Sequence, residues 1–351
     1  MERGDTPVTA GRRARPVVLV ALTGAVLAAL CLASLALGAR AIPLDQVVQA
    51  LTGHVPGPGG QAAENVVWSV RVPRTVLGVA AGVALGLSGA LMQALTRNPL
   101  ADPGVLGVTA GASFAIVLSI TVLGVGSLFG YIWFGFAGAL AASVFVYMLG
   151  RLGRSGLTPV KLALAGVAVT ALLSSLTGAI VLTDPEPLNR YRYWSAGSLA
   201  SQDAGVVWRI LPFLAAGTVL AMACAPALNS LSLGEDVATA LGRRLGLVRL
   251  QGVTAVMLLT GGAVAVIGPI VFIGLVVPHV ARVLATRAGI GPDHRWLLPL
   301  AALISPCLLL AADITGRLVA RPSEIQAGVL MAFIGGPFFI AMVRRRKLAE
   351  V

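Results

Sequence analysis

The chain contains long, nearly uninterrupted runs of apolar residues, each about as long as a helix that crosses a lipid bilayer. A crossing needs about 20 mostly apolar residues to span a hydrocarbon core of about 30 Å. Backbone groups in lipid have no water to bond, so such segments are helical. The sequence therefore predicts an all-α, polytopic integral membrane protein with about ten transmembrane helices. The predicted spans are residues 16–38, 75–95, 105–123, 132–150, 161–182, 206–226, 250–268, 270–286, 297–318 and 325–343.

The composition excludes an ordinary soluble protein. Hydrophobic residues make up 57% of the chain and charged residues only 11%, whereas soluble domains carry roughly 25% charged residues. The net charge of +12 is compatible with nucleic acid, but Phe, Trp and Tyr amount to only 5%, too few for stacking on bases. We therefore expect a lipid bilayer as the main environment and no nucleic-acid partner.

The distribution of Lys and Arg predicts the orientation. Ten crossings that start inside place most of the 26 basic residues on the inner side, in agreement with the positive-inside rule. The organisation is then a basic cytoplasmic N-terminus (1–15), one ten-helix transmembrane domain (16–343) and a basic cytoplasmic tail (344–351). The basic residues expected on the outer side are Arg40, Arg71, Arg74, Arg190, Arg192, Arg209, Arg317 and Arg321.

Two features of the spans leave alternatives open. The sequence Ile267-Gly268-Pro269-Ile270 interrupts residues 250–286, which form either two short helices or one broken helix. The first span resembles a signal peptide, but its apolar core is longer than the usual 7–15 residues, so we expect it to remain a span.

In the second span, Gly78, Gly82, Gly86 and Gly89 form a small-residue face that favours close helix packing.

The chemistry of an enzyme is missing from the sequence. The chain has no Gly-x-x-x-x-Gly-Lys-[Ser/Thr] loop, no Cys/His spacing typical of a metal site and no Gly-x-Ser-x-Gly motif. We expect no catalytic residue, no metal site and no cofactor bound by this chain. Asp313 and Arg317 lie one helical turn apart and can form an ion pair, with either a structural or a docking role. No series of membrane-embedded acids marks an ion-coupling pathway.

The longest inner connection, residues 227–249, predicts a short helix. Ser232 or Gly234 can cap it, Glu235 and Asp236 lie in its first turn, where negative charge complements the helix dipole, and Gly242 follows its end.

Several motifs, in the same order along the chain, are similar to those of the permease family of ferric-siderophore, haem and cobalamin ABC importers, the FecCD type. The loop after the second span is most similar to one half of ferric-enterobactin-type permeases. The matching motifs are Arg71-Val72-Pro73-Arg74, Asn98-Pro99-Leu100-Ala101-Asp102-Pro103, Trp194-Ser195-Ala196-Gly197-Ser198, Leu233-Gly234-Glu235 with Ala240-Leu241-Gly242, Gly268-Pro269-Ile270, Pro278-His279, Asp293-His294-Arg295, Ala312-Asp313, Glu324-Ile325-Gln326-Ala327-Gly328 and Gly335-Gly336-Pro337.

The resemblance implies a type II ABC importer permease with ten spans and roles for three groups of residues. A coupling helix at 228–242 would contact the ATPase, although Glu235 and Asp236 can instead serve only as its cap. The outward arginines would dock a substrate-binding protein, against the alternative that exposed arginines merely solvate a surface. The inner loop from Asn98 to Pro103 would break the chain at the inner surface. The groups are, for coupling, Leu233, Gly234, Glu235, Asp236, Ala240, Leu241 and Gly242; for docking, Arg71, Arg74 and Arg317; and for the inner loop, Asn98, Pro99, Leu100, Asp102 and Pro103.

The resemblance also implies partners and a substrate. The expected assembly contains a second permease subunit, with a heterodimer favoured over a homodimer, two cytoplasmic ATPase subunits that hold ATP and Mg, and an extracytoplasmic substrate-binding protein. Its location would be the cytoplasmic membrane of a bacterium. Iron would be carried as a siderophore chelate. A cobalamin or haem permease, an ion-coupled secondary transporter, and an exporter or receptor without ATPase remain as alternatives.

Overall fold

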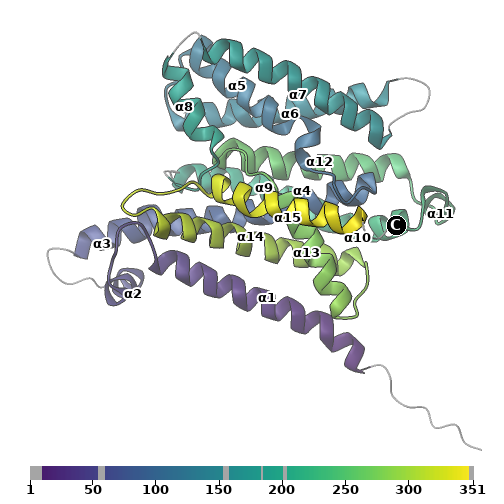
Figure 1. Cartoon of the computed structure of the whole chain (residues 1–351), viewed down its shortest axis with the longest axis horizontal. Helices are drawn as coiled ribbons and strands as arrows, with labels where there is room; N and C mark the ends of the chain where they lie inside the picture. The colour runs from purple at the N-terminus through teal and green to yellow at the C-terminus, as the bar shows by residue number, and fades with distance from the viewer. Residues whose placement is uncertain (1–9, 54–59, 153–157, 183–184, 201–203, 348–351) are drawn as a thin grey trace, which may run out of the picture.

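A computed structural model describes residues 10–53, 60–152, 158–182, 185–200 and 204–347, and in this part of the chain all regular structure is helical (Figure 1). Residues 1–9 of the predicted basic N-terminus and 348–351 of the predicted basic tail lie outside the described residues. The helices are α1 (Ala10–Ala36), α2 (Leu44–Thr52), α3 (Gly60–Val66), the π-helix η1 (Val67–Arg71), α4 (Val72–Thr96), the 3-10 helix η2 (Pro103–Leu106), α5 (Val108–Leu123), α6 (Leu128–Arg151), α7 (Pro159–Val181), α8 (Pro185–Ser195), α9 (Ala204–Ala223), α10 (Ala225–Ser232), α11 (Glu235–Ala240), α12 (Leu245–Ile267), α13 (Ile273–Arg287), α14 (His294–Val319) and α15 (Ala327–Lys347).

Each of the ten predicted spans overlaps a helix of the structure, but not all of these helices are long. In the described part, seven helical stretches have the length and composition to cross a membrane, and α5 and residues Ala327–Met342 of α15 are shorter apolar helices. The remaining predicted span, α13, has only 15 residues, or about 22 Å at 1.5 Å per residue. The seven stretches are Arg15–Ala36, Gln61–Thr96, Gly130–Arg151, Val160–Val181, Gly205–Ala223, Leu245–Ile267 and His294–Val319.

Helix α4 forms the centre of the bundle, and its glycines allow the close packing predicted from the sequence. A Cβ atom added at Gly82 would lie 2.4 Å from the Cα of Pro306 in α14, and one at Gly89 would lie 2.1 Å from the carbonyl oxygen of Gly274 in α13. Because even one methyl group would collide with backbone atoms, these two glycines set the distance from α4 to its neighbours.

Around α4 the other helices form recognisable groups (Figure 1). Helices α5, α6 and α7 pack on one another along one side, α8 lies beside them, and α1 runs along α14 on the opposite side. Helix α1 exposes large apolar residues, including Val17, Leu22 and Leu32, as expected for a helix that faces lipid.

The interruption in residues 250–286 produces two separate helices. Helix α12 ends at Ile267, Gly268 has a φ of 73°, and Phe272 adopts the left-handed region with a φ of 67° before α13 begins. Pro269 has no N–H to continue the helix. The structure therefore selects the first of the two sequence alternatives.

The two ends of the bundle differ in their connections. Helices α2, α3 and α8 lie at one end, called here the α2 end, and α10 and α11 lie at the other, called the α11 end (Figure 1). Helix α1 begins and α15 finishes at the α11 end, so the start of the first helix and the end of the last lie on the same side of the bundle.

Candidate functional site

Three of the sequence motifs meet at one junction near the α2 end, where three glycine backbones touch. The Gly328 N–H donates to the Gly197 carbonyl at 2.8 Å. A Cβ at Gly268 would lie 2.0 Å from the Trp194 carbonyl oxygen. The Ser198 N–H also bonds the last carbonyl of α12, that of Ile267, at 2.8 Å. The C-terminal end of α8, the break after α12 and the start of α15 are thereby fixed to one another.

The motif between α4 and η2 starts at the surface and continues inward. Arg97 ends α4 in the left-handed region, with a φ of 51°. The Asn98 Oδ1 accepts from the Leu100 N–H at 2.9 Å, and the Asp102 Oδ1 accepts from the Gly104 N–H at 2.8 Å, which caps η2. Asn98 and Leu100 are exposed, whereas Pro103 is buried.

Asp102 and Pro103 line a cavity of about 40 Å³ between this loop and the break after α12. The same cavity is lined by Thr260 and Pro269. Asp102 and Pro103 therefore pack into the gap that the helix break leaves, and the position of the motif at the inner membrane surface stays a prediction. Desolvation raises the pKa of Asp102, although its bond from Gly104 acts in the opposite direction.

A polar contact inside the bundle joins α4 to α13. The Gln93 Nε2 donates to the Gly274 carbonyl at 3.2 Å, and its Oε1 accepts from the Arg282 Nη2 at 2.5 Å. Sequence reasoning missed Gln93 and Arg282. The available signal was an amide in an apolar span, since polar groups within spans are costly unless they are bonded.

At the α2 end, one buried carboxylate holds two arginines. The Asp313 Oδ1 lies 2.7 Å from the Arg74 Nη2, and its Oδ2 lies 2.9 Å from the Arg317 Nη2. The side chains of Asp313 and Arg317 are only 1% and 2% exposed. The predicted i, i+4 ion pair is thus present, with Arg74 as a further partner. Arg74 also contacts Glu324, at 2.7 Å, whose side chain is 31% exposed.

Arg71 and Arg317 cap the last turn of α1. The final carbonyls of a helix have no intrahelical donors and carry partial negative charge, which guanidinium groups complement. Arg71 donates to the carbonyls of Leu35 and Ala36 at 2.7 and 2.8 Å, and Arg317 donates to that of Leu37 at 2.9 Å.

The view of Arg71, Arg74 and Arg317 as exposed outer arginines is therefore wrong. Their exposed fractions are 3%, 6% and 2%. The count of Lys and Arg did not show that α1 would end against them. Their docking role stays a prediction.

The predicted coupling helix at 228–242 is two short helices, α10 and α11. Gly234 separates them with a φ of 116° and a ψ of 155°, values that no helix allows. Gly234 is therefore the cap, Glu235 and Asp236 lie in the first turn of α11, and Gly242 follows with a φ of 78°.

The Glu235 carboxylate has a partner within this chain. It accepts from the Arg249 Nη2 of α12 at 2.6 Å, which ties the start of α11 to the start of α12. Glu235 is thus engaged in an ion pair and is more than a cap.

Leu233, Val237 and Leu241 form an exposed apolar row on the α10–α11 segment. Their exposed fractions are 66%, 44% and 61%, and they follow one another at i, i+4 and i+8. Sequence reasoning named Leu233 and Leu241 but missed Val237, which lies between them in the same connection. Gly234 separates Leu233 from α11, so the three residues do not share one helical face. Ala240 and Gly242 are exposed as well, while Ala238 faces inward and is fully buried.

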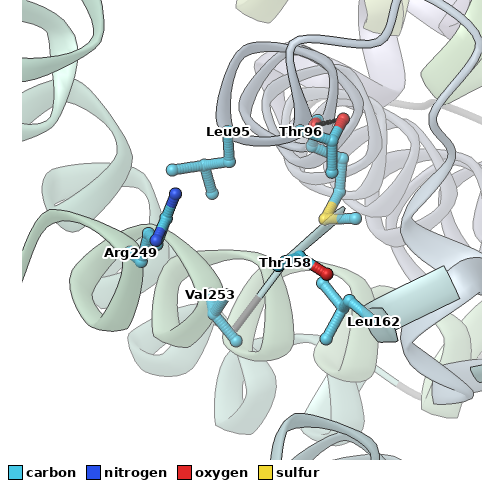
Figure 2. Close-up of a pocket in the computed structure, with 7 residues that line it drawn as sticks. Leu95, Thr96, Thr158, Leu162, Arg249 and Val253 are labelled. Carbon is cyan, nitrogen blue, oxygen red and sulfur yellow. Dashed lines mark hydrogen bonds between the residues drawn. The ribbon is translucent and has the colours of Figure 1, made fainter. Parts of the chain in front are cut away.

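A small cavity lies next to the Glu235–Arg249 pair, between the ends of α4, α7 and α12 (Figure 2). Its volume is about 20 Å³. Leu95, Val253 and Leu162 give it an apolar wall, and the Arg249 side chain extends toward Leu95 across it (Figure 2). Arg249 would therefore transmit a movement of α11 to the end of α4.

Helix α10 is also fastened to the first turn of α14. The Asn229 Nδ2 donates to the Asp293 Oδ1 at 2.5 Å, and the Asn229 Oδ1 accepts from the His294 N–H at 2.8 Å. Asp293 itself caps α14 through the Arg295 N–H at 2.8 Å. Together with the Glu235–Arg249 pair, these bonds link the α10–α11 segment to two of the spans.

Among the described residues, no three His, Cys, Asp or Glu side chains group together in a way that would hold a metal ion.

Comparison with known proteins places this architecture among transporters. The chain is 48% identical over 315 residues to the ferric enterobactin transport system permease protein FepD of Escherichia coli, with 89% of this chain and 91% of FepD covered. It is 39% identical over 329 residues to the siderophore transport system permease protein YfiZ of Bacillus subtilis, with 94% and 96% covered.

The fold is also that of a solved transporter. A structure of a metal-chelate type ABC transporter in an inward-facing conformation matches with a TM-score of 0.79 and 25% identity, over 94% of this chain and 99% of that one. The relatives are permease proteins of transport systems, so the role of this chain is transport rather than catalysis. The model of the FecCD transport family matches residues 25–345, and the chain belongs to that family.

Proposed function

We propose that this chain is the membrane-spanning permease subunit of an ATP-binding-cassette importer that moves a ferric-siderophore complex across the cytoplasmic membrane of a bacterium by alternating access. The observation that carries the proposal is the likeness to FepD over nearly the full length of both chains. The motifs of the α2 end, of the helix break and of the α11 end all lie within residues 25–345, which the FecCD transport family model matches.

The energy of ATP hydrolysis reaches the permease through the α10–α11 segment. Two cytoplasmic ATPase subunits, which hold ATP and Mg, bind the exposed row of Leu233, Val237 and Leu241. This proposal is supported by the exposure of these apolar side chains beyond the ends of the spans, since neighbouring exposed apolar side chains mark a contact surface for a partner. The Glu235–Arg249 pair and the bonds of Asn229 transmit the movement to α12 and α14.

A substrate-binding protein docks at the α2 end, over Arg71, Arg74 and Arg317. In the conformation described here these arginines bind α1, Asp313 and Glu324. Glu324 is the more exposed of the two carboxylates on Arg74, so an acidic side chain of the binding protein competes with Glu324 for this guanidinium group. Docking then loosens the loop that leads into α15.

The functional unit contains a second, non-identical permease subunit, with a homodimer as the alternative. Both chain ends are cytoplasmic. The start of α1 and the end of α15 both lie at the α11 end of the bundle, which supports this orientation. The predicted concentration of Lys and Arg on that side supports it as well.

Reconstitution tests the proposal. The chain is inserted into liposomes with its companion permease and ATPase subunits, and binding protein preloaded with radioactive ferric enterobactin is added. We expect uptake that requires ATP and stops when the ATPase is inactivated.

Haem and cobalamin loaded on the same binding protein serve as competing substrates. Faster uptake of either would replace the siderophore assignment while keeping the importer. Uptake driven by an ion gradient without the ATPase would overturn the importer itself.

A further inference from the structure

A cavity of about 300 Å³ lies at the α2 end, between α8 and the residues that lead into α15. It is lined by Asn189, Arg192, Tyr193, Ala196 and Gln326. This volume is at the lower limit of small-molecule sites, which range from about 300 to 1,000 Å³. None of the three regions considered so far, the arginine cluster, the helix break and the α11 end, uses these five side chains.

The cavity is built on one face of a short helix. Asn189, Arg192, Tyr193 and Ala196 follow one another at i, i+3, i+4 and i+7, so they share a single face of α8. The opposite side of the helix faces the bundle. There Trp194 is 7% exposed, and its Nε1 donates to the Ala265 carbonyl at 3.3 Å. Packing on the inside therefore presents the polar face outward.

The far wall of the cavity is held in place by backbone contacts. Gly328 bonds Gly197 at 2.8 Å, and a Cβ atom at Gly328 would lie 2.4 Å from the Ala196 carbonyl oxygen. These contacts fix Gln326, at the start of α15, opposite the face of α8. The lining is thus part of the rigid junction of the three glycine backbones, although it lies close to the surface.

The lining residues are suited to an oxygen-rich anion. Arg192 supplies a permanently charged fork of donors, Tyr193 a phenol, and Asn189 and Gln326 two amides. No carboxylate of the described residues lines the cavity. Tyr193 is 72% exposed and Arg192 is also exposed, so both side chains are accessible to a ligand.

We propose that this face of α8, with Gln326, is a recognition site for anionic, catecholate-type iron chelates as they pass from the binding protein into the permease. The inference rests on the proposed function. Catecholate oxygens give a ferric chelate net negative charge, whereas tris-hydroxamate chelates are neutral. Charge-assisted bonds from Arg192 distinguish the two, and Tyr193 offers a ring against the aromatic ligand.

The test uses the complete reconstituted importer and binding protein saturated with radioactive ferric catecholate. In Arg192→Gln, uptake per transporter falls about tenfold, the loss expected for one hydrogen bond to a charged group. Arg192→Lys keeps most of the uptake because it keeps the charge. The affinity for loaded binding protein, and the ATPase rate that it stimulates, stay at the wild-type values.

Arg40→Gln is the matched control. Arg40 is exposed at the same end of the bundle but does not line the cavity, so its loss leaves uptake unchanged. Gln326→Leu is a second variant in case Arg192→Gln does not assemble, and we expect it to lower uptake about threefold because it removes one neutral hydrogen bond.

The outcomes separate the inference from the proposed function. If wild-type importer moves no ferric chelate, the proposed function fails. If wild type transports the chelate but Arg192→Gln does too, or Arg192→Lys is no better than Arg192→Gln, recognition of charge is excluded. Equal losses of uptake, docking and ATPase stimulation would show a structural role and overturn the inference.

A lipid phosphate would present similar chemistry to Arg192. The uptake assay is therefore repeated in liposomes of zwitterionic lipid alone. The difference between wild type and Arg192→Gln persists if the chelate is the ligand, and its disappearance would assign the site to anionic lipid instead.

Discussion

Asp313 pairs with Arg74 and Arg317 at once: its Oδ1 accepts from the Arg74 Nη2 at 2.7 Å, and its Oδ2 forms an ion pair with the Arg317 Nη2 at 2.9 Å, with 1% of the Asp313 side chain exposed. Through these two partners a single residue of α14 connects α4 to the end of α1. A buried charge is tolerated only when it is paired and hydrogen-bonded. This relationship makes the cluster a structural centre of the α2 end.

Asp313→Asn tests that role. The substitution leaves two buried guanidinium groups without their shared counterion, and we expect a loss of about 3–5 kcal/mol of stability, visible as a lower unfolding temperature of the purified complex in detergent. Glu324→Gln is the control, because the Arg74–Glu324 pair is partly exposed and such pairs contribute about 0.2–1 kcal/mol. Equal stability of the two variants would contradict a central role for Asp313.

Glu324→Gln also tests how the binding protein docks. If an acidic side chain of that protein competes with Glu324 for Arg74, removing the Glu324 charge strengthens docking, by about twofold to fivefold for an ion pair of this exposure. Surface plasmon resonance with the permease in nanodiscs measures the Kd. Asp45→Asn, an exposed carboxylate of α2 at the same end, should leave the Kd unchanged. Weaker docking of Glu324→Gln would argue that Glu324 itself contacts the binding protein.

The arginine cluster also shows what could be predicted from the sequence and what could not. The apolar runs are a local property of the sequence, so the all-helical fold and the approximate positions of its apolar helices follow from them. Whether Arg71 is exposed depends on where the last carbonyls of α1, those of Leu35 and Ala36, come to lie in three dimensions. No pattern within 30 residues of Arg71 contains that information.

The same reasoning applies to the α11 end. Gly234, Glu235 and Gly242 could be placed as cap, first turn and terminator because capping is local. The prediction of a single coupling helix was wrong because the backbone angles of one glycine, Gly234, decide whether α10 continues. The partner of Glu235, Arg249, lies 14 residues further on in α12, and Gly197 and Gly328 meet only because the helix break brings them together.

A charge swap tests the Glu235–Arg249 pair. Glu235→Lys brings two cations together at the junction of α11 and α12 and should lower ATP-driven uptake. Combining Glu235→Arg with Arg249→Glu restores the attraction and should recover most of the uptake. Asp236→Asn, the exposed neighbour in the same turn, is the control. If the double variant stays as inactive as Glu235→Lys, Glu235 acts by contacting the ATPase rather than by pairing with Arg249.

The exposed apolar row predicts how strongly the ATPase binds. Val237→Asp places a charge in the middle of the row formed with Leu233 and Leu241, and we expect at least a tenfold weaker association, because burying one such side chain contributes about 1.5–3 kcal/mol. Co-purification and titration of ATPase activity with permease measure the loss. Thr239→Asp, an exposed position beside the row, controls for added charge. A similar defect in both variants would mean that charge alone, without the apolar contact, weakens binding.

The close approach of α4 and α13 predicts that one methyl group is enough to disturb the bundle. In Gly89→Ala the new Cβ would lie 2.1 Å from the Gly274 carbonyl oxygen. The helix cannot rotate away, because Gly82 packs equally closely on Pro306 and Gln93 bonds Gly274 one turn further along. Overpacking of this kind costs about 1–3 kcal/mol or more, and the separation of α13 from α4 should also reduce transport.

Gly178→Ala provides the comparison for Gly89→Ala. Gly178 lies within α7, and a Cβ there would have no atom within 4 Å. Alanine favours the helix by about 1 kcal/mol relative to glycine, so this variant should be at least as stable as wild type. The two substitutions make the same chemical change in two long apolar helices, and thermal unfolding of the purified proteins compares them directly. Equal unfolding temperatures would show that α13 can move away from α4 at little cost, and the packing at Gly89 would then not determine the spacing of these helices.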